Sequence, residues 1–181
     1  MKGSNGHRQH VVITGSEHNA STFLIALLTH LGLDTGFSVD DLVRNQSQRS
    51  RSGLEHDIRH PRCPYIVRST HYAEHVGQTV TRGDVDILHL YVPCAGEPDA
   101  TLSRQLTQLS MQWPTAAAPV TWLDASRCQL DSEYLFRQLQ PVLGNFPFPL
   151  FSEVFAAVRG GNPAAQILDR SHTTAGQSAL N

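Results

Sequence analysis

A short glycine turn followed by hydroxyl side chains is the part of this sequence that most directly suggests chemistry. The apolar residues Val11–Ile13 precede Gly15 and a polar turn, and apolar residues then recur at helical spacing from Phe23 to Leu31. A strand, a tight turn and a helix in succession present backbone N–H groups at the helix start, where the helix dipole favours an anion. The sequence therefore predicts a phosphate-binding loop at Gly15–Thr22.

Strands and helices are predicted to alternate around this turn. Strands are predicted over residues 10–15, 63–68, 85–92 and 120–123. Helices are predicted over residues 20–31, 39–45, 72–80, 98–111, 131–140 and 153–158. This alternation predicts one three-layer α/β domain with a mainly parallel central sheet over residues 10–160. Residues 1–9 are expected to form a mobile arm and residues 161–181 a disordered tail.

Three polar turns are expected to meet at one edge of that sheet. Ligands of parallel α/β sheets bind beyond the carboxyl ends of the strands. The turns that follow predicted strands there are Gly15–Thr22, Ser69–His71 and Pro93–Ser103. We therefore expect the chemistry of the chain to lie among these three segments.

The first turn differs from the usual nucleoside-triphosphate loop, because Ala20 replaces its second glycine and Ser21 its lysine. It resembles the phosphosulfate-binding loop of the sulfotransferases, which commonly reads G-x-P-R/K-S-G-T-T and continues into an apolar helix. Gly15, Ser21 and Thr22 keep the residue types of that loop. The positions that differ are the proline, the cation and the second glycine, which are here Glu17, His18 and Ala20.

The second turn strengthens this resemblance. Arg68-Ser69-Thr70-His71 looks like the K/S-T-H motif of cytosolic and plant sulfotransferases, whose histidine deprotonates the acceptor hydroxyl. An imidazole suits that task, because its ordinary pKa lies close to neutral pH. In the third turn, Ser103 matches the family's serine for the nucleotide 3′-phosphate, whereas the position of its arginine falls on Cys94 or Ala95.

The resemblance implies a domain of the P-loop type that moves a sulfuryl group from 3′-phosphoadenosine-5′-phosphosulfate to an acceptor hydroxyl. It implies His71 as the base and His18 in the place of the loop cation. The residues that it implies around the nucleotide are Gly15, Ser16, Asn19, Ala20, Ser21, Thr22 and Ser103. The acceptor, a small molecule or a protein hydroxyl, has no recognisable signature in the sequence. The missing cations at His18 and at Cys94 or Ala95 favour an alternative, a non-catalytic domain of the same fold that binds a protein partner or another anion.

A group of histidine and cysteine residues between positions 56 and 75 offers a second kind of site. Its members are His56, His60, Cys63, His71 and His75. Histidine pairs four residues apart on a helix can bind zinc, but Pro61 and Pro64 interrupt the first pair. The spacing matches no zinc motif, and no metal is expected.

Composition narrows the class of protein further. The net charge of −2 provides no basic footprint for nucleic acid or for an anionic membrane. No apolar segment approaches the roughly 20 residues that a membrane helix requires. The 3 cysteines are odd in number and far apart, which fits a reducing compartment. The sequence therefore predicts a cytoplasmic protein without nucleic-acid or membrane partners.

Overall fold

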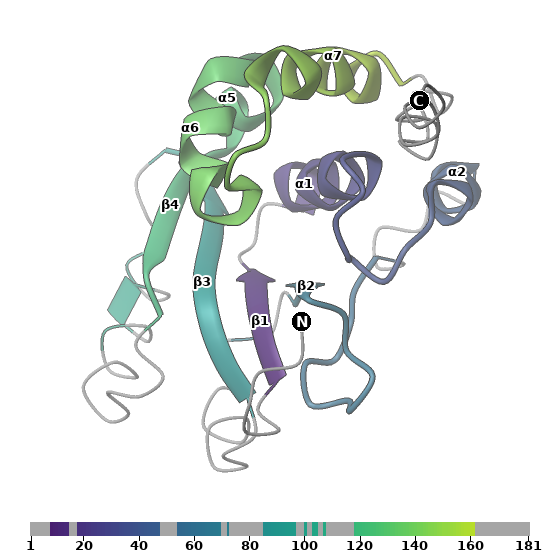
Figure 1. Ribbon diagram of the computed structural model, residues 1–181. Helices are drawn as coiled ribbons and strands as arrows, with labels where there is room; N and C mark the ends of the chain where they lie inside the picture. Colours follow the sequence, from purple (N-terminus) through teal and green to yellow (C-terminus); the bar gives the residue numbers. More distant parts are fainter. Residues whose placement is uncertain are drawn as a thin grey trace, which may run out of the picture.

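A four-stranded parallel sheet lies at the centre of the fold (Figure 1). Its strands are β1 (Arg8–Ile13), β2 (Ile66–Arg68), β3 (Val85–Cys94) and β4 (Val120–Asp124), in the order β2-β1-β3-β4. Each neighbouring pair is parallel. The computed structural model describes residues 8–14, 18–47, 54–69, 72, 85–96, 100, 103–104, 107 and 118–161. The predicted α/β class with a parallel sheet is confirmed.

β1 is an interior strand, and its sequence shows why. Val11, Val12 and Ile13 are at most 1% exposed, so this strand is covered on both faces. A strand buried on both faces reads as a continuous apolar run rather than as an alternating one. β1 pairs with β2 on one side and with β3 on the other, with an irregularity in the β3 pairing between His10 and Val11.

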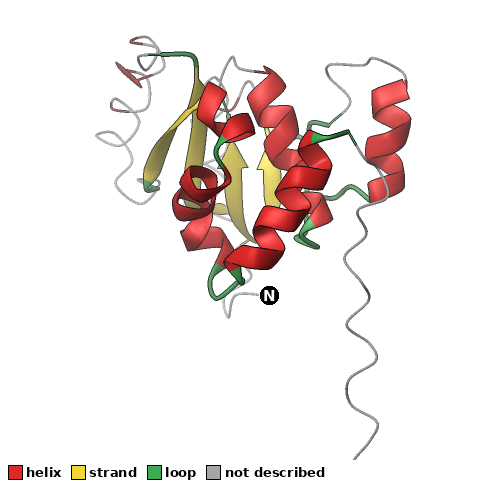
Figure 2. Ribbon diagram, turned by 90° about the horizontal axis from the view of Figure 1, so that it is seen from above, coloured by secondary structure: helices red, strands yellow, loops and turns green. Residues whose placement is uncertain are grey.

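Helices cover one face of the sheet. They are α1 (His18–His30), α5 (Ala125–Leu130), α6 (Ser132–Leu143) and α7 (Phe148–Arg159), while α2 (Val39–Ser47) lies beside α1 (Figures 1 and 2). Leu24 and Leu28 of α1 and Phe151 of α7 join Ile13 and Tyr91 of the sheet in the larger hydrophobic core. The apolar sides of these helices are therefore buried in the core on this face of the sheet, where α7 packs on α1 and α6.

The opposite face of the sheet carries a smaller core. Val12, Val67 and Val92 pack there with Ile58, which comes from the irregular segment 54–65, and with Tyr72. The helices expected over residues 72–80 and 98–111 are described only at residues 72, 100, 103, 104 and 107, all of which are helical. The rest of the predicted third layer lies outside the described residues.

Several element boundaries differ from the predictions for local reasons. α5 was not expected, but Asp124 ends β4 and caps this helix by accepting from the backbone N–H groups of Ser126 and Arg127. Asp131 accepts from Tyr134 N and caps α6 directly afterwards. The helix predicted over residues 153–158 begins earlier, at Phe148, with Pro147 as its N-cap and Pro149 in its first turn, because proline is well tolerated at a helix start.

β3 continues to Cys94, two positions beyond the predicted end at residue 92, and so includes Pro93. Pro93 keeps its place in the parallel register opposite Leu123 of β4. β1 begins at Arg8, two positions before the predicted start, and β2 is restricted to Ile66–Arg68.

Among the described residues no single helix is long and apolar enough to cross a membrane. The pair α6 and α7 passes that test of length and composition only when both are taken together across a bend of 116°.

Candidate functional site

The carboxyl ends of β1 and β2 lie side by side. Ile13 is opposite Arg68 in the parallel register, and Ser69 N donates to Ile13 O at 2.9 Å. On the other side of β1, Thr14 N donates to Tyr91 O of β3 at 2.9 Å. The turns after β1 and β2 therefore leave the sheet from the same edge, where the sequence places its two principal motifs.

The predicted loop residues that are described lie in the first turns of α1. Ala20 and Ser21 are buried, Thr22 is half-buried, and Asn19 is exposed. His18 is the first residue of α1, but its side chain is outside the described part of the chain. Gly15, Ser16 and His71 also lie outside the described residues, and so does Glu17.

Arg68 is the important side chain at this edge, and the motif that names it in the sequence gives it no role. It ends β2, its side chain is 0% exposed, and its Nε donates to Ser21 Oγ at 3.0 Å. Its Nη2 lies 3.7 Å from Glu55 Oε1. Burial lowers the pKa of the Arg68 guanidinium, and the negative charge of Glu55 opposes that shift. The sequence contains a signal for this buried cation. Alternate residues of a strand share a face, so Arg68, two positions after Ile66, lies on the same face as that buried side chain.

Thr14 contributes a buried hydroxyl at the end of β1. The residue is 1% exposed, and its Oγ1 has no hydrogen-bond partner among the described residues. Leaving a buried hydroxyl unpaired costs roughly 1–3 kcal/mol. Strand alternation places it on the face of Val12, opposite the face of Arg68. Two polar side chains therefore flank the end of β1 from both faces of the sheet.

The carboxyl ends of β3 and β4 are engaged in local structure. Cys94 Sγ donates to Leu123 O at 3.4 Å, and Ala95 is exposed. The Asp124 carboxylate accepts from Ser126 Oγ at 2.6 Å, and this bond is the main cause of its lowered pKa. The position that the resemblance assigns to an arginine thus holds no cation. Ser103 is helical and half-buried, and its carbonyl accepts from Thr107 Oγ1 at 2.8 Å.

The candidate metal ligands that are described do not gather into a site. Within the described ranges, no three histidine, cysteine, aspartate or glutamate side chains are grouped as metal ligands would be. Cys63 is half-buried, and burial raises its pKa to about 12. His71 and His75 lie outside the described residues.

His56 is packed as a neutral ring. It stacks on Phe37 with ring centroids 4.6 Å apart, and its Nε2 is buried without a hydrogen-bond partner among the described residues. Burial lowers the pKa of His56, and the neighbouring His60 adds to this effect, whereas the Thr35 backbone and Asp34 oppose it. Protonation of Nε2 would place a charged N–H group in this buried position, where no described residue accepts a hydrogen bond from it.

We therefore expect the protein to lose stability in mild acid. The unfolded chain binds a proton at His56 near pH 6.5, whereas the folded chain does so only at lower pH. The free energy of unfolding therefore keeps its full value above pH 6.5. It falls as the pH drops from 6.5 to the lowered pKa of His56. His89, whose pKa is also lowered by burial, acts in the same direction. Urea unfolding at several pH values should show a smaller loss for His56→Gln than for the parent, and equal losses would contradict the assignment.

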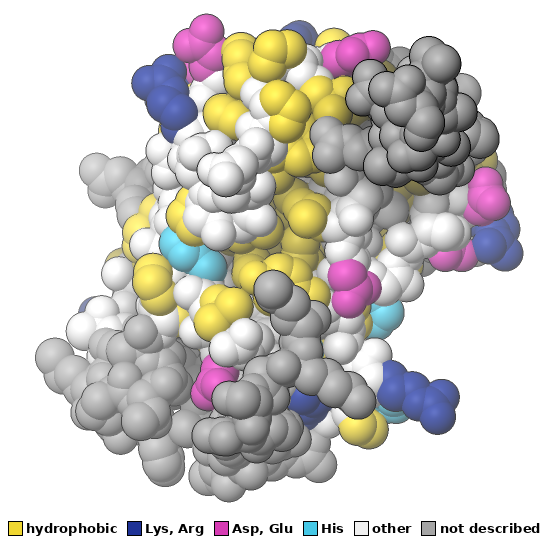
Figure 3. All heavy atoms as spheres, in the orientation of Figure 1, with side chains coloured by type: hydrophobic (Ala, Val, Ile, Leu, Met, Phe, Trp, Pro, Cys, Tyr) yellow, Lys and Arg dark blue, Asp and Glu magenta, His cyan; other side chains and the backbone are white. Residues whose placement is uncertain are grey.

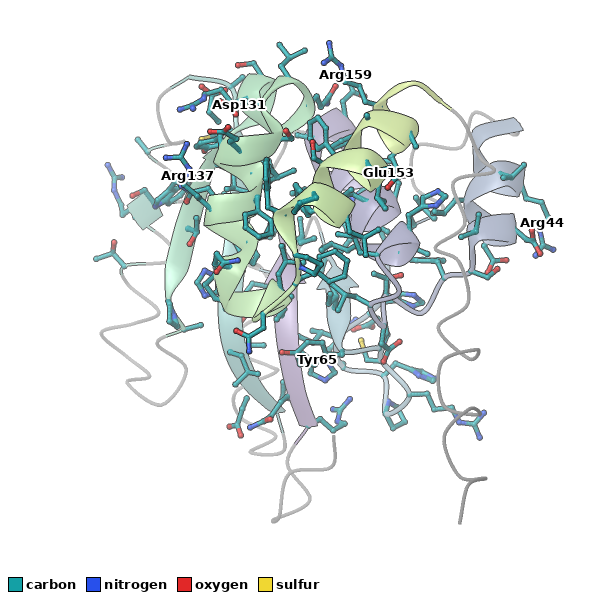
Figure 4. All side chains as sticks on the ribbon, turned by 45° about the horizontal axis from the view of Figure 1, so that its top comes forward. Arg44, Tyr65, Asp131, Arg137, Glu153 and Arg159 are labelled. Carbon is teal, nitrogen blue, oxygen red and sulfur yellow. The ribbon has the colours of Figure 1, made fainter. Side chains whose placement is uncertain are left out.

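On the face shown in Figure 3, the described arginine side chains lie apart from one another. Figure 4 labels Arg137 on α6 and Arg159 at the end of α7, and both are exposed. Arg159 is the last residue of α7, and Gly160 follows it as the C-cap.

Comparisons with known proteins supply no relative. No family model matches this chain, and no curated protein or solved structure matches it either. The function of this chain is therefore inferred from its own motifs and from the strands that position them.

Proposed function

We propose that this protein binds a 3′-phosphoadenosine nucleotide at the turn after β1 and transfers a sulfuryl group to an acceptor hydroxyl. The observation that supports this function best is the placement of the two motifs. Gly15–Thr22 follows β1 and Ser69–His71 follows β2, and these strands are parallel neighbours in register. A base at His71, after β2, is then next to an anion bound by the turn after β1. The same proposal includes a three-layer fold of the P-loop type.

The reaction requires two roles from the chain, a base for the acceptor hydroxyl and donors for the departing phosphate. His71 removes the proton of the acceptor hydroxyl, whose oxygen attacks the sulfur atom. The bond between sulfur and the bridging phosphate oxygen breaks, and 3′-phosphoadenosine-5′-phosphate leaves with that electron pair. Backbone N–H groups of the loop and the hydroxyls of Ser21 and Thr22 stabilise the charge on the departing phosphate.

Isothermal titration calorimetry with 3′-phosphoadenosine-5′-phosphate tests this proposal. We expect saturable binding of one nucleotide per chain at submillimolar concentration. Adenosine 5′-monophosphate, which lacks the 3′-phosphate, is the control ligand and should bind more weakly. The absence of heat at millimolar nucleotide, with a chain shown to be folded by circular dichroism, would overturn the proposal.

The second candidate is a non-catalytic domain that binds an anion or a protein partner. It is favoured by the end of β3, where Cys94 bonds to Leu123 O and Ala95 is exposed, so this position supplies no cation to a nucleotide. The two candidates differ in turnover. The transferase consumes radiolabelled 3′-phosphoadenosine-5′-phosphosulfate in the presence of a phenol, whereas the non-catalytic domain leaves it intact.

A further inference from the structure

Arg68 is the largest fully buried side chain in the described part of the chain. A guanidinium in the interior loses its hydration and needs compensating groups around it. An apolar side chain of similar size would fill the same volume without that penalty. We therefore look for the role of this cation in its position. Arg68 lies at the carboxyl end of β2, opposite the end of β1.

Arg68 reaches the first turns of α1. Its Nε donates to Ser21 Oγ at 3.0 Å, and because arginine has only donors, the serine oxygen is the acceptor. Ser21 is the fourth residue of α1. The guanidinium is thus one side chain away from the helix start at which the proposed nucleotide binds. Its charge adds to the helix dipole in attracting an anion there.

Glu55 contacts the same guanidinium from the surface. The distance of 3.7 Å between Glu55 Oε1 and Arg68 Nη2 is that of an ion pair but exceeds a hydrogen bond. The Glu55 side chain is 27% exposed and belongs to the irregular segment 54–65. The next residue fixes this segment, because His56 N donates to Arg68 O at 3.1 Å. A carboxylate is therefore held close to Arg68 without ideal geometry.

We propose that Arg68 is the cation of the nucleotide site and that Glu55 is an internal anion which the bound nucleotide displaces from it. This inference rests on the proposed function. Arg68 then takes the role of the cation that the loop lacks at His18. Phosphate oxygens can accept two parallel N–H bonds from one guanidinium, so they exchange favourably with a carboxylate oxygen that lies 3.7 Å from Nη2. Glu55 accordingly weakens nucleotide binding in the parent protein.

Glu55→Gln tests the displacement directly, because it removes the competing charge and keeps the size of the side chain. We expect the affinity for 3′-phosphoadenosine-5′-phosphate, measured by calorimetry, to rise about fivefold or more, the usual range for coupled sites. Asp57→Asn is the matched control. It makes the same change in net charge in the same segment, at a carboxylate that pairs with Arg59 at 2.6 Å. We expect it to leave affinity within about twofold, since exposed ion pairs contribute little.

The possible outcomes separate this inference from the proposed function. Tighter binding by Glu55→Gln alone supports displacement. Equal gains in nucleotide affinity in both variants would show a general effect of charge. Weaker binding by Glu55→Gln would show that Glu55 orients Arg68 for the ligand. Either result overturns the inference but not the proposed function. No binding by the folded parent or by Glu55→Gln would overturn both. Arg68→Lys, which keeps the charge but loses the planar fork, should weaken binding by about tenfold, and unchanged affinity would also overturn the inference.

Discussion

Replacing His71 by alanine is expected to lower the rate of sulfuryl transfer about 100- to 10,000-fold, the usual contribution of a general base. A hydroxyl is a weak nucleophile until a positioned group removes its proton, and His71 follows the strand next to the proposed phosphate loop. Nucleotide affinity should stay unchanged, because the base contacts the acceptor and not the nucleotide. The measurement is the release of 3′-phosphoadenosine-5′-phosphate with p-nitrophenol as acceptor, beside calorimetric titration of the same variant.

His75→Ala provides the matched control for this experiment. It removes the same type of side chain four positions later, outside the motif that resembles the sulfotransferase base. We expect its rate to remain close to that of the parent. Transfer that persists in His71→Ala would remove His71 from the mechanism, and equal losses in both variants would indicate a disturbed segment rather than a lost base.

Gly36→Ala is expected to destabilise the protein by about 3 kcal/mol, from left-handed backbone strain together with a steric clash. Gly36 has a φ of +74°, which residues with a side chain rarely adopt. A Cβ at this position would lie 2.7 Å from His56 Nε2 and 3.0 Å from Pro64 Cγ. The His56 ring has little freedom to retreat, because it is stacked on Phe37. Urea unfolding followed by circular dichroism measures the loss.

Gly32→Ala separates the two causes. Gly32 has nearly the same φ, +77°, but an added Cβ would meet nothing within 4 Å. It should therefore lose only the backbone contribution of about 1 kcal/mol. Equal losses at Gly32 and Gly36 would mean that the contact with His56 adds nothing. The comparison also tests how firmly the segment that carries Glu55 is held against the connection between α1 and α2.

The sequence predicted the sheet well because its strands have strong local signals. Val11–Ile13 forms an apolar run that only an interior strand explains, and β3 is long and rich in β-branched and aromatic residues. α5 was missed because it has only six residues and starts directly after β4, so hydrophobic periodicity has too little length to show it. The start of α7 was predicted too late because Pro147 and Pro149 disfavour a helix interior, whereas here they stand at the N-cap and in the first turn.

The candidate site could be predicted less completely. The shared edge of the two motifs follows from parallel strands alone, but the neighbours of each side chain depend on packing. Arg68 ends an apolar strand, and the sequence contains no sign that Ser21 and Glu55 approach it from positions far away in the chain. His56 likewise lies in a stretch of candidate metal ligands, whereas the structure stacks it on Phe37.

The central place of β1 also has a consequence for synthesis of the chain. Its partners lie downstream, since Val11 pairs with Ile66 on one side and with His89 on the other. β1 therefore leaves the ribosome before both of its partners and remains without a sheet until they have emerged. Such delayed, long-range pairing slows folding and leaves an apolar segment open to aggregation. Nascent chains that stop before Ile66 should accordingly depend on chaperones, and those that extend past β3 should depend on them less.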